Sequence, residues 1–399
     1  MGLGETGGAA RCGQAAKSPN VATALVAIAA FLLFGLNNTV TIALPSHLMA
    51  LGTGPFVAGL QNSLFVLVAV LLRVLLERTV ARRGSRLSLM VGAIGYTAPC
   101  LLLAGCAEPQ GIVALRIAQA IGLALFQPGV AQYLAAISPA SSLGRRLGIV
   151  RFATTASLMA GPAILLPIIN LHGYQAFFGA LALAGACGTV AACALPKDPT
   201  GKTAPRRLRA ADQTLPRRQT ALLFACPLLL ASGYSVIMNF GHTLAGQRLA
   251  ESADGLLFAC LSAGGLAGSV AAGWATDACG AKRSTAGAMA LSGAGLLLMA
   301  VGGKPASVLA GALLSGAGYF GATATLVAAA GLLSSGNANA LLARQQSALD
   351  LGMICGGFAA GALLQGDVPL SATFLAASVA SGAALGAWSM MYPGQEERD

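Results

Sequence analysis

Long stretches without any charged residue constrain the fold of this chain more than any other feature. No Lys, Arg, Asp or Glu lies between Lys17 and Arg73, and further apolar stretches follow along the chain. Apolar stretches of about 18 or more residues are typical of membrane-spanning helices. Only 9% of the 399 residues are charged. Soluble domains average about 25%, so this chain has too little polar surface for a soluble fold. The sequence therefore predicts an all-α integral membrane protein.

Apolar runs and the turn residues between them divide the chain into about twelve predicted spans. We expect these spans at residues 21–44, 55–76, 87–106, 110–136, 147–168, 174–195, 220–245, 254–276, 284–302, 306–333, 341–364 and 369–391.

One long polar segment, residues 196–219, divides the predicted spans into two sets of six. It contains four prolines and seven basic residues, which is typical of a linker. The predicted organisation is an N-terminal six-helix bundle (21–195) and a C-terminal six-helix bundle (220–391). Residues 1–20 and 392–399 are expected to be tails.

The positions of the basic residues predict which side of the membrane each loop faces. When the loops are numbered alternately from an inside N-terminus, 21 of the 24 Lys and Arg residues fall inside, Arg248 and Lys304 fall outside, and Arg116 lies within a span. This positive-inside pattern predicts that both termini and the linker are cytoplasmic and that the protein lies in the inner (plasma) membrane. The net charge of +11 therefore reflects topology and does not indicate nucleic-acid binding.

A short charged sequence follows the second span of each half and indicates an internal repeat. It is GWATDACGAKR in the second half and VLLERTVARRGSR in the first half. A shift of 196 residues places Gly84 on Gly280 and Arg86 on Lys282, and a further glycine match falls in the fifth span of each half. Together with the six-plus-six span count, these matches predict a duplicated membrane protein.

The chain resembles the major facilitator superfamily over essentially its whole length after residue 20. GWATDACGAKR resembles that family's cytoplasmic signature after the second span of a half. LRIAQAIGLA (115–124) resembles its fourth-span pattern of Arg, Gln three residues on and Gly three further. Gly161 and Pro162 resemble the fifth-span motif of proton-coupled exporters, although Ser157 and Leu165 stand where that pattern prefers Gly. The resemblance implies twelve helices in two pseudo-symmetric six-helix bundles.

The resemblance also implies that the charged turns form a cytoplasmic gate. The residues concerned are Gly273, Asp277, Gly280, Lys282 and Arg283 in the second half and Arg82, Gly84 and Arg86 in the first half. Asp277 would meet the positive end of a neighbouring helix, or basic residues, when the cytoplasmic side is closed. This contact is called the latch below. Alternatively, Lys282 and Arg283 satisfy only the positive-inside pattern and Asp277 caps a turn.

The first-half copy of this gate motif departs from the family pattern. Ala81 occupies the position of the Asp. Either Glu77, one helical turn earlier on the same face, supplies the missing charge, or the first-half latch is degenerate.

Two ionisable side chains other than His are predicted to lie well inside the membrane. A charge there costs about 2.5–3.5 kcal/mol on insertion scales, so each needs an explanation. Arg116 lies on the fourth span with Gln119 one turn further in. Arg116 either lines the cavity, where it couples protons or holds a polar substrate, or it snorkels to the interface from near the outer end of its helix.

Asp350, on the eleventh span, is the only acidic residue that we place near mid-membrane. Burial favours the neutral form of a carboxyl, which suits a group that picks up and releases a proton. The alternative is a structural Asp that bonds to a neighbouring helix. The candidates for proton coupling are therefore Asp350, Arg116 and Glu77.

Uncharged polar side chains on several spans are further candidates to line a central cavity. Besides Arg116 and Gln119, these are Asn37, Asn38, Asn239, His242 and Tyr319. For any one of them, hydrogen bonding between buried helices is at least as good an explanation.

No catalytic motif stands out in the sequence. It lacks GxSxG, HExxH and Walker sequences, its three histidines lie on separate loops or spans, and its nine cysteines form no CxxC pair. We therefore predict no enzyme activity, no cofactor and no metal site. The expected partners are a small-molecule substrate, protons and the lipid bilayer, and we expect a monomer.

The leading functional prediction is a secondary transporter that exports a small organic molecule in exchange for protons, by rocking its two halves around a central site. An importer or uniporter of a sugar or other small metabolite is the alternative. A membrane enzyme would need a clustered nucleophile or acid–base pair, and a receptor or scaffold would not need Arg116 or Asp350 inside the membrane.

Overall fold

The computed structural model describes residues 19–391 except 139, 197–215, 250–253 and 334–337. The predicted tails and most of the predicted linker therefore lie outside the described residues. The described helices are α1 (Pro19–Ala50), α2 (Pro55–Arg83), α3 (Ser85–Leu103), α4 (Pro109–Ala118), α5 (Ala120–Ile137), α6 (Ala140–Cys193), α7 (Arg217–Arg248), α8 (Asp254–Val301), α9 (Pro305–Leu333), α10 (Ala338–Gln365) and α11 (Leu370–Ser389).

Two of these helices are long enough to cross a membrane twice. The apolar parts of α6 and α8 have 48 and 47 residues, whereas about 20 residues span a bilayer. The backbone leaves the helical conformation at Gly173 (φ 79°, ψ 176°) and at Gly280 (φ 77°, ψ 159°), a conformation that only glycine adopts readily. When α6 and α8 are divided there, and α4 and α5 are joined through Gln119, the ten candidate spanning helices among the described residues give the twelve predicted spans.

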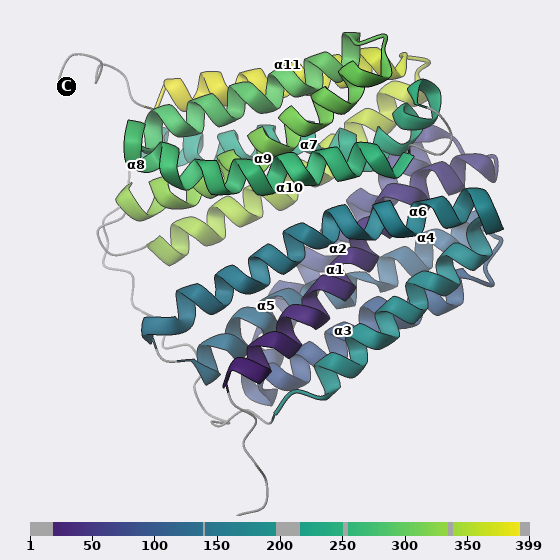
Figure 1. Cartoon of the computed structure of the whole chain (residues 1–399), viewed down its shortest axis with the longest axis vertical. Coiled ribbons are helices and arrows are strands. Elements are labelled where there is room, and N and C mark those ends of the chain that lie inside the picture. The colour runs from purple at the N-terminus through teal and green to yellow at the C-terminus, as the bar shows by residue number, and fades with distance from the viewer. Residues whose placement is uncertain (1–18, 139, 197–215, 250–253, 334–337, 392–399) are drawn as a thin grey trace, which may run out of the picture.

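The helices form two groups, α1–α6 and α7–α11, which Figure 1 shows side by side in purple to teal and in green to yellow. Within the first group α1 packs against α6, and within the second group α8 packs along α9. Between the groups, α2 packs against α10, α6 against α8 and α1 against α7. This is the predicted arrangement of two bundles. Below, the end of the helices at which residues 196 and 216 flank the linker is called the linker end, and the opposite end is called the far end.

Small residues allow the backbones of α8 and α9 to approach closely. A Cβ at Gly264 would collide with the carbonyl of Leu313, and a Cβ at Gly316 would collide with the carbonyl of Leu261. This close contact replaces the hydrophobic driving force that is missing between helices in lipid.

Large apolar side chains are exposed on the outer surface of both groups. They include Ile94, Leu183, Leu297 and Val379, on α3, α6, α8 and α11. A soluble monomer rarely exposes apolar side chains so widely. The surface is that of a protein surrounded by lipid.

Backbone geometry confirms the internal repeat at the charged turns. Gly84 (φ 91°, ψ 152°) lies between α2 and α3, and Gly280 adopts nearly the same conformation in the equivalent turn of the second half. Both positions need glycine for the same reason, because a side chain strains the backbone at positive φ.

Candidate functional site

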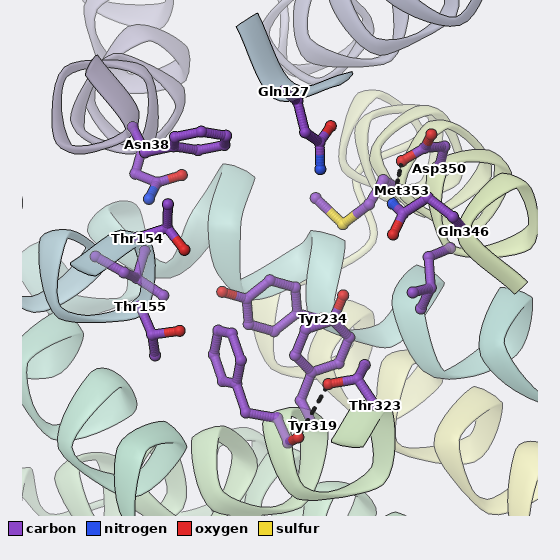
Figure 2. Close-up of a pocket in the computed structure, with 14 residues that line it drawn as sticks. Asn38, Gln127, Thr154, Thr155, Tyr234, Tyr319, Thr323, Gln346, Asp350 and Met353 are labelled. Atoms are coloured by element: carbon purple, nitrogen blue, oxygen red, sulfur yellow. Dashed lines mark hydrogen bonds between the residues drawn. The ribbon is translucent and has the colours of Figure 1, made fainter. Parts of the chain in front are cut away.

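A cavity of about 200 Å³ lies between the two groups of helices, and both groups line it. Its first-half wall comes from α1, α5 and α6, and its second-half wall comes from α7, α9 and α10. Figure 2 shows the cavity with Gln127 opposite a pair of tyrosines, Asn38 and Thr154 on one side, and Gln346 and Asp350 on the other. A cavity shared by two bundles changes shape whenever the bundles move relative to each other.

Aromatic rings form much of the second-half wall. Tyr234 and Tyr319 stack with ring centroids 3.8 Å apart and planes 5° from parallel. Phe320 meets both rings edge to face, at 5.8 Å and 5.2 Å. Phe34 lines the cavity from the first half. Tyr319 therefore lies where the sequence predicted, whereas Tyr234 and Phe34 were missed.

An ion pair joins the halves at the edge of this cavity. Arg73 on α2 donates from Nη1 to Oδ2 of Asp350 on α10 over 3.1 Å. The two side chains are 27% and 17% exposed. Arg73 Nη2 also donates to Gln127 Oε1 over 3.2 Å, and Gln346 Nε2 donates to Asp350 Oδ1 over 3.0 Å. Asp350 is thus bound from both sides.

This pair corrects the prediction that Arg116 and Asp350 are the only ionisable groups other than His deep in the spans. Arg73 is a third in the same region: it is the last residue of the candidate spanning segment Pro55–Arg73, and its guanidinium extends from α2 to Asp350 on α10, the eleventh span. In this structure Asp350 bonds to a neighbouring helix, which is the second of the two alternatives that the sequence left open.

Arg116 forms a separate buried cluster outside the cavity lining. Its side chain is fully buried. Nη1 donates to Asn37 Oδ1 (3.0 Å) and Gln119 Oε1 (2.9 Å), and Nη2 donates to Thr41 Oγ1 and to Asn62 Oδ1. The guanidinium carbon also lies 3.7 Å from the centroid of the Phe65 ring.

Two predictions for this cluster are wrong. Arg116 does not snorkel to the interface, because side chains from α1 and α2 surround it. Arg116, Gln119 and Asn37 are also not among the residues that line the cavity; Arg116 instead donates to the side-chain oxygens of the other two. Gln119 Nε2 in addition donates to the carbonyl of Tyr96 and lies 3.0 Å from Cys100 Sγ.

The other predicted cavity residues divide between the lining and the helix interfaces. Asn38 lines the cavity. Asn239 is fully buried and donates to Ser235 O (2.8 Å), one turn earlier on α7. His242 is half-buried on α7 and is not among the residues that line the cavity.

The residues of the predicted gate motif lie at the linker end. Asp277, Gly273 and Arg283 are exposed, and Asp277 shows no hydrogen bond or ion pair within the described part of the chain. Asp277 therefore forms no latch contact with a described residue. Glu77 and Arg82 lie on α2, but their side chains are outside the described residues.

The basic residue after the turn glycine anchors the sixth helix in the first half. Arg86 donates to the carbonyls of Leu195 (2.7 Å) and Cys193 (3.1 Å), at the end of α6. A cation at a helix C-terminus satisfies free carbonyls and complements the helix dipole. In the second half Trp388 Nε1 donates to the carbonyl of Lys282 over 2.9 Å, which ties the same turn to α11.

The predicted fifth-span motif packs against the first helix and touches the second half. A Cβ at Gly161 would lie 2.6 Å from Thr39 Oγ1 and 3.0 Å from the carbonyl of Gly35. The carbonyl of Pro162 lies 3.3 Å from the point where a Cβ of Gly255, on α8, would stand. The motif thus allows close packing at two helix interfaces.

The halves also meet along a seam that runs from the cavity toward the far end, called here the far-end seam. A Cβ at Gly59 would lie 2.5 Å from the carbonyl of Gly357. Phe56 and Phe358 meet edge to face at 5.2 Å. Ser63 Oγ donates to the carbonyl of Ile354 over 2.8 Å. These contacts close the cavity on its far-end side.

Two six-span halves around a shared central cavity define a polytopic membrane transporter. A family model described as "Major Facilitator Superfamily" matches residues 26–250. The chain belongs to the Major Facilitator Superfamily.

Solved structures of transporters share this fold. A mutant form of the nucleoside transporter NupG aligns with a TM-score of 0.76 at 14% identity, over 93% of this chain and 100% of that one. A bacterial homolog to the human lysosomal transporter Spinster, in an inward-facing and unoccupied conformation, has a TM-score of 0.70 at 11% identity, over 94% and 95%. A POT family transporter in complex with a thioalcohol-conjugated peptide has a TM-score of 0.71 at 13% identity, over 93% and 94%. A comparison with curated protein sequences finds no match.

Proposed function

We propose that this protein is a secondary active transporter that exports a small organic molecule from the cytoplasm in exchange for protons. One observation carries the proposal: both halves line the cavity, and an ion pair between Arg73 and the Asp350 carboxylate joins the halves at its edge. Export of a substrate in exchange for protons needs both elements, a site shared by the two halves and an acidic group that can take up a proton from the side to which the site is open.

The proposed orientation has the linker end in the cytoplasm, as the basic residues of the loops predict. The far-end seam then separates the cavity from the outside. Asp277 is exposed and shows no hydrogen bond or ion pair with a described residue, which agrees with a latch that is open at the linker end. In this proposal the protein is a monomer in the inner (plasma) membrane and alternates by rocking one half against the other.

Asp350 is the proposed proton carrier. As a carboxylate it attracts Arg73 across the cavity edge, and it accepts a hydrogen bond from Gln346. Protonation removes the charge and weakens the attraction between α2 and α10, so the halves separate more readily. Because Asp350 lines the cavity, water reaches it from the side to which the cavity is open.

Transport into proteoliposomes with an imposed pH gradient tests this role. Asp350→Asn keeps the shape and the bond to Gln346 but cannot be ionised. We expect it to abolish accumulation driven by the pH gradient and to leave substrate counterflow largely intact. Asp367→Asn is the matched control, because Asp367 is an exposed turn residue with φ 58°, a conformation that Asn tolerates well.

Full proton-driven accumulation by Asp350→Asn would show that Asp350 is structural. Arg116 lies buried and apart from the cavity, so coupling would then need another group, or the protein would be a uniporter. Loss of both accumulation and counterflow would place Asp350 in substrate binding and not in proton coupling.

A further inference from the structure

We infer that the cavity binds a small, uncharged, planar heteroaromatic solute whose edge carries both hydrogen-bond donors and acceptors. The inference rests on the proposed function, in which this cavity is the transport site. It is argued from the charge, the size and the chemistry of the lining.

The charges around the cavity cancel. Asp350 is the acid of the lining, and the guanidinium of Arg73 neutralises it. The other nearby guanidinium, that of Arg116, is sealed behind α1 and α2 and bonded to oxygens of Asn37, Gln119 and Thr41. A charged solute would have to leave water without an opposite charge to meet it, or break the pair first. Both routes are unfavourable, so the lining favours a neutral solute.

The cavity is also small. Its volume of about 200 Å³ is below the ~300–1,000 Å³ of typical pockets for drug-sized ligands. One or two fused rings with small substituents fit such a space, whereas bulky lipophilic drugs do not.

The lining offers aromatic faces and free amide groups at the same time. Tyr319 and Phe34 contribute rings from opposite halves, and rings of this kind attract flat π-systems in stacked or edge-to-face contacts. Among the described residues, Asn38 shows no hydrogen bond of its own. Gln127 uses its carbonyl oxygen for Arg73, and Gln346 uses its nitrogen for Asp350.

These amides therefore present free hydrogen-bonding groups to the cavity. The nitrogen of Gln127 is a donor and the oxygen of Gln346 is an acceptor, and Asn38 offers both its amide nitrogen and its amide oxygen. A heterocycle with adjacent C=O and N–H groups, such as a nucleobase, a nucleoside or nicotinamide, satisfies them. A plain hydrocarbon ring leaves them unpaired, at a cost that makes polar sites selective.

Equilibrium binding to the purified full-length protein in detergent tests the inference without requiring transport. The probes are uridine, adenine and nicotinamide as neutral heteroaromatics, uridine 5′-monophosphate as an anion, benzyltrimethylammonium as an aromatic cation, and ribose as a solute without an aromatic ring. We expect at least one neutral heteroaromatic to bind at least about 10-fold more tightly than each of the three other classes, a difference of about 1.4 kcal/mol. Tighter binding of the anion, the cation or ribose overturns the inference, and so does failure of all three heteroaromatics to bind.

Variants assign the binding to this cavity. Tyr319→Leu should weaken binding of the preferred probe about 10-fold, which is about 1.4 kcal/mol, while Tyr319→Phe keeps the ring and should stay within about 3-fold of the unmodified protein, about 0.6 kcal/mol. The matched control is Tyr174→Leu, which removes a tyrosine ring that packs against His47 at the far end and does not line the cavity. Equal loss in Tyr319→Leu and Tyr174→Leu would contradict a site at Tyr319.

Failure of this inference can be distinguished from failure of the proposed function. If proteoliposomes accumulate a charged solute or a sugar under a pH gradient, the protein is a transporter and the substrate class is wrong. If a neutral heteroaromatic binds as expected but no solute crosses the membrane, the binding site stands and the transport proposal fails.

Discussion

Replacing Gly59 by alanine would test whether the far-end seam is a gate. The added Cβ would stand 2.5 Å from the carbonyl of Gly357 and 3.1 Å from the Cα of Gly361. Both are backbone atoms that cannot turn aside. To reach an ordinary contact of 3.4 Å, α2 and α10 must separate by about 0.9 Å. Overpacking of this kind costs about 1–3 kcal/mol, and the cost falls only on the state in which the seam is closed.

The expected result is a shift of the equilibrium toward the state open at the far end, by roughly 5- to 150-fold. Spin labels at residues 51 and 366, in the far-end turns of the two halves, would report it as a larger population of long distances. The background should have its exposed native cysteines replaced by serine. Gly287→Ala is the matched control, because a Cβ at Gly287, on α8, meets nothing within 4 Å. A distance distribution for Gly59→Ala that equals that of Gly287→Ala would refute the gate.

Three further predictions address other parts of the molecule. Arg116→Lys should lower the free energy of unfolding in detergent by about 1.5–3 kcal/mol, because lysine loses at least one of the charged hydrogen bonds of the guanidinium; a loss below about 0.5 kcal/mol would contradict a structural role. Asp277→Asn should raise the population open at the linker end, because it weakens the latch of the closed state, and should slow turnover, measured with spin labels on the linker-end turns. Unchanged distances together with unchanged transport would contradict the latch. A cysteine at position 206 in the linker should react with an impermeant reagent only after intact cells are permeabilised, and reaction before permeabilisation would invert the proposed topology.

The spans were predictable from the sequence because the cost of burying charge in lipid leaves few alternatives. Long uncharged runs must be helices, and the glycines at 173 and 280 break the two longest of them where the hydropathy pattern predicted a turn. The repeat was predictable because the charged turn of each half carries a glycine at the matching position, and only glycine suits the positive φ at Gly84 and Gly280. No knowledge of the packing was needed for either.

The lining of the cavity was much less predictable. In a soluble helix the buried face is apolar and the other face is polar, so the period of the pattern reveals the orientation. Here lipid and protein interior are both apolar, and the rotation of each helix leaves little trace in the sequence. Asn37 and Asn38 are neighbours on α1, yet Asn37 bonds to Arg116 and Asn38 faces the cavity. Gln127 and Gln346 carry no motif, and only their positions opposite Arg73 and Asp350 reveal them.

The position of the Arg73 charge was missed for a related reason. A basic residue near the predicted end of a span is easily assigned to the positive-inside pattern. The long, flexible side chain of arginine allows the charge to lie far from its own Cα, and here it extends from α2 to α10. The partner that draws it there, Asp350, is 277 residues away in the chain.

The two halves are joined by different physical means at the far-end seam and at the cavity edge, and under the proposed function this difference bears on proton coupling. The far-end seam described above consists of glycine backbones, an aromatic pair and a hydrogen bond from Ser63 to a carbonyl, and none of these groups titrates near neutral pH. The contact at the cavity edge toward the linker end is an ion pair. A proton can therefore weaken the attraction at the second contact while it leaves the first unchanged. Under the proposed function, a carboxyl group on one side only gives protonation an unequal effect on the two contacts, which is what an ordered exchange requires. Placed symmetrically, the same carboxylate would weaken both contacts together and would allow leakage in place of exchange.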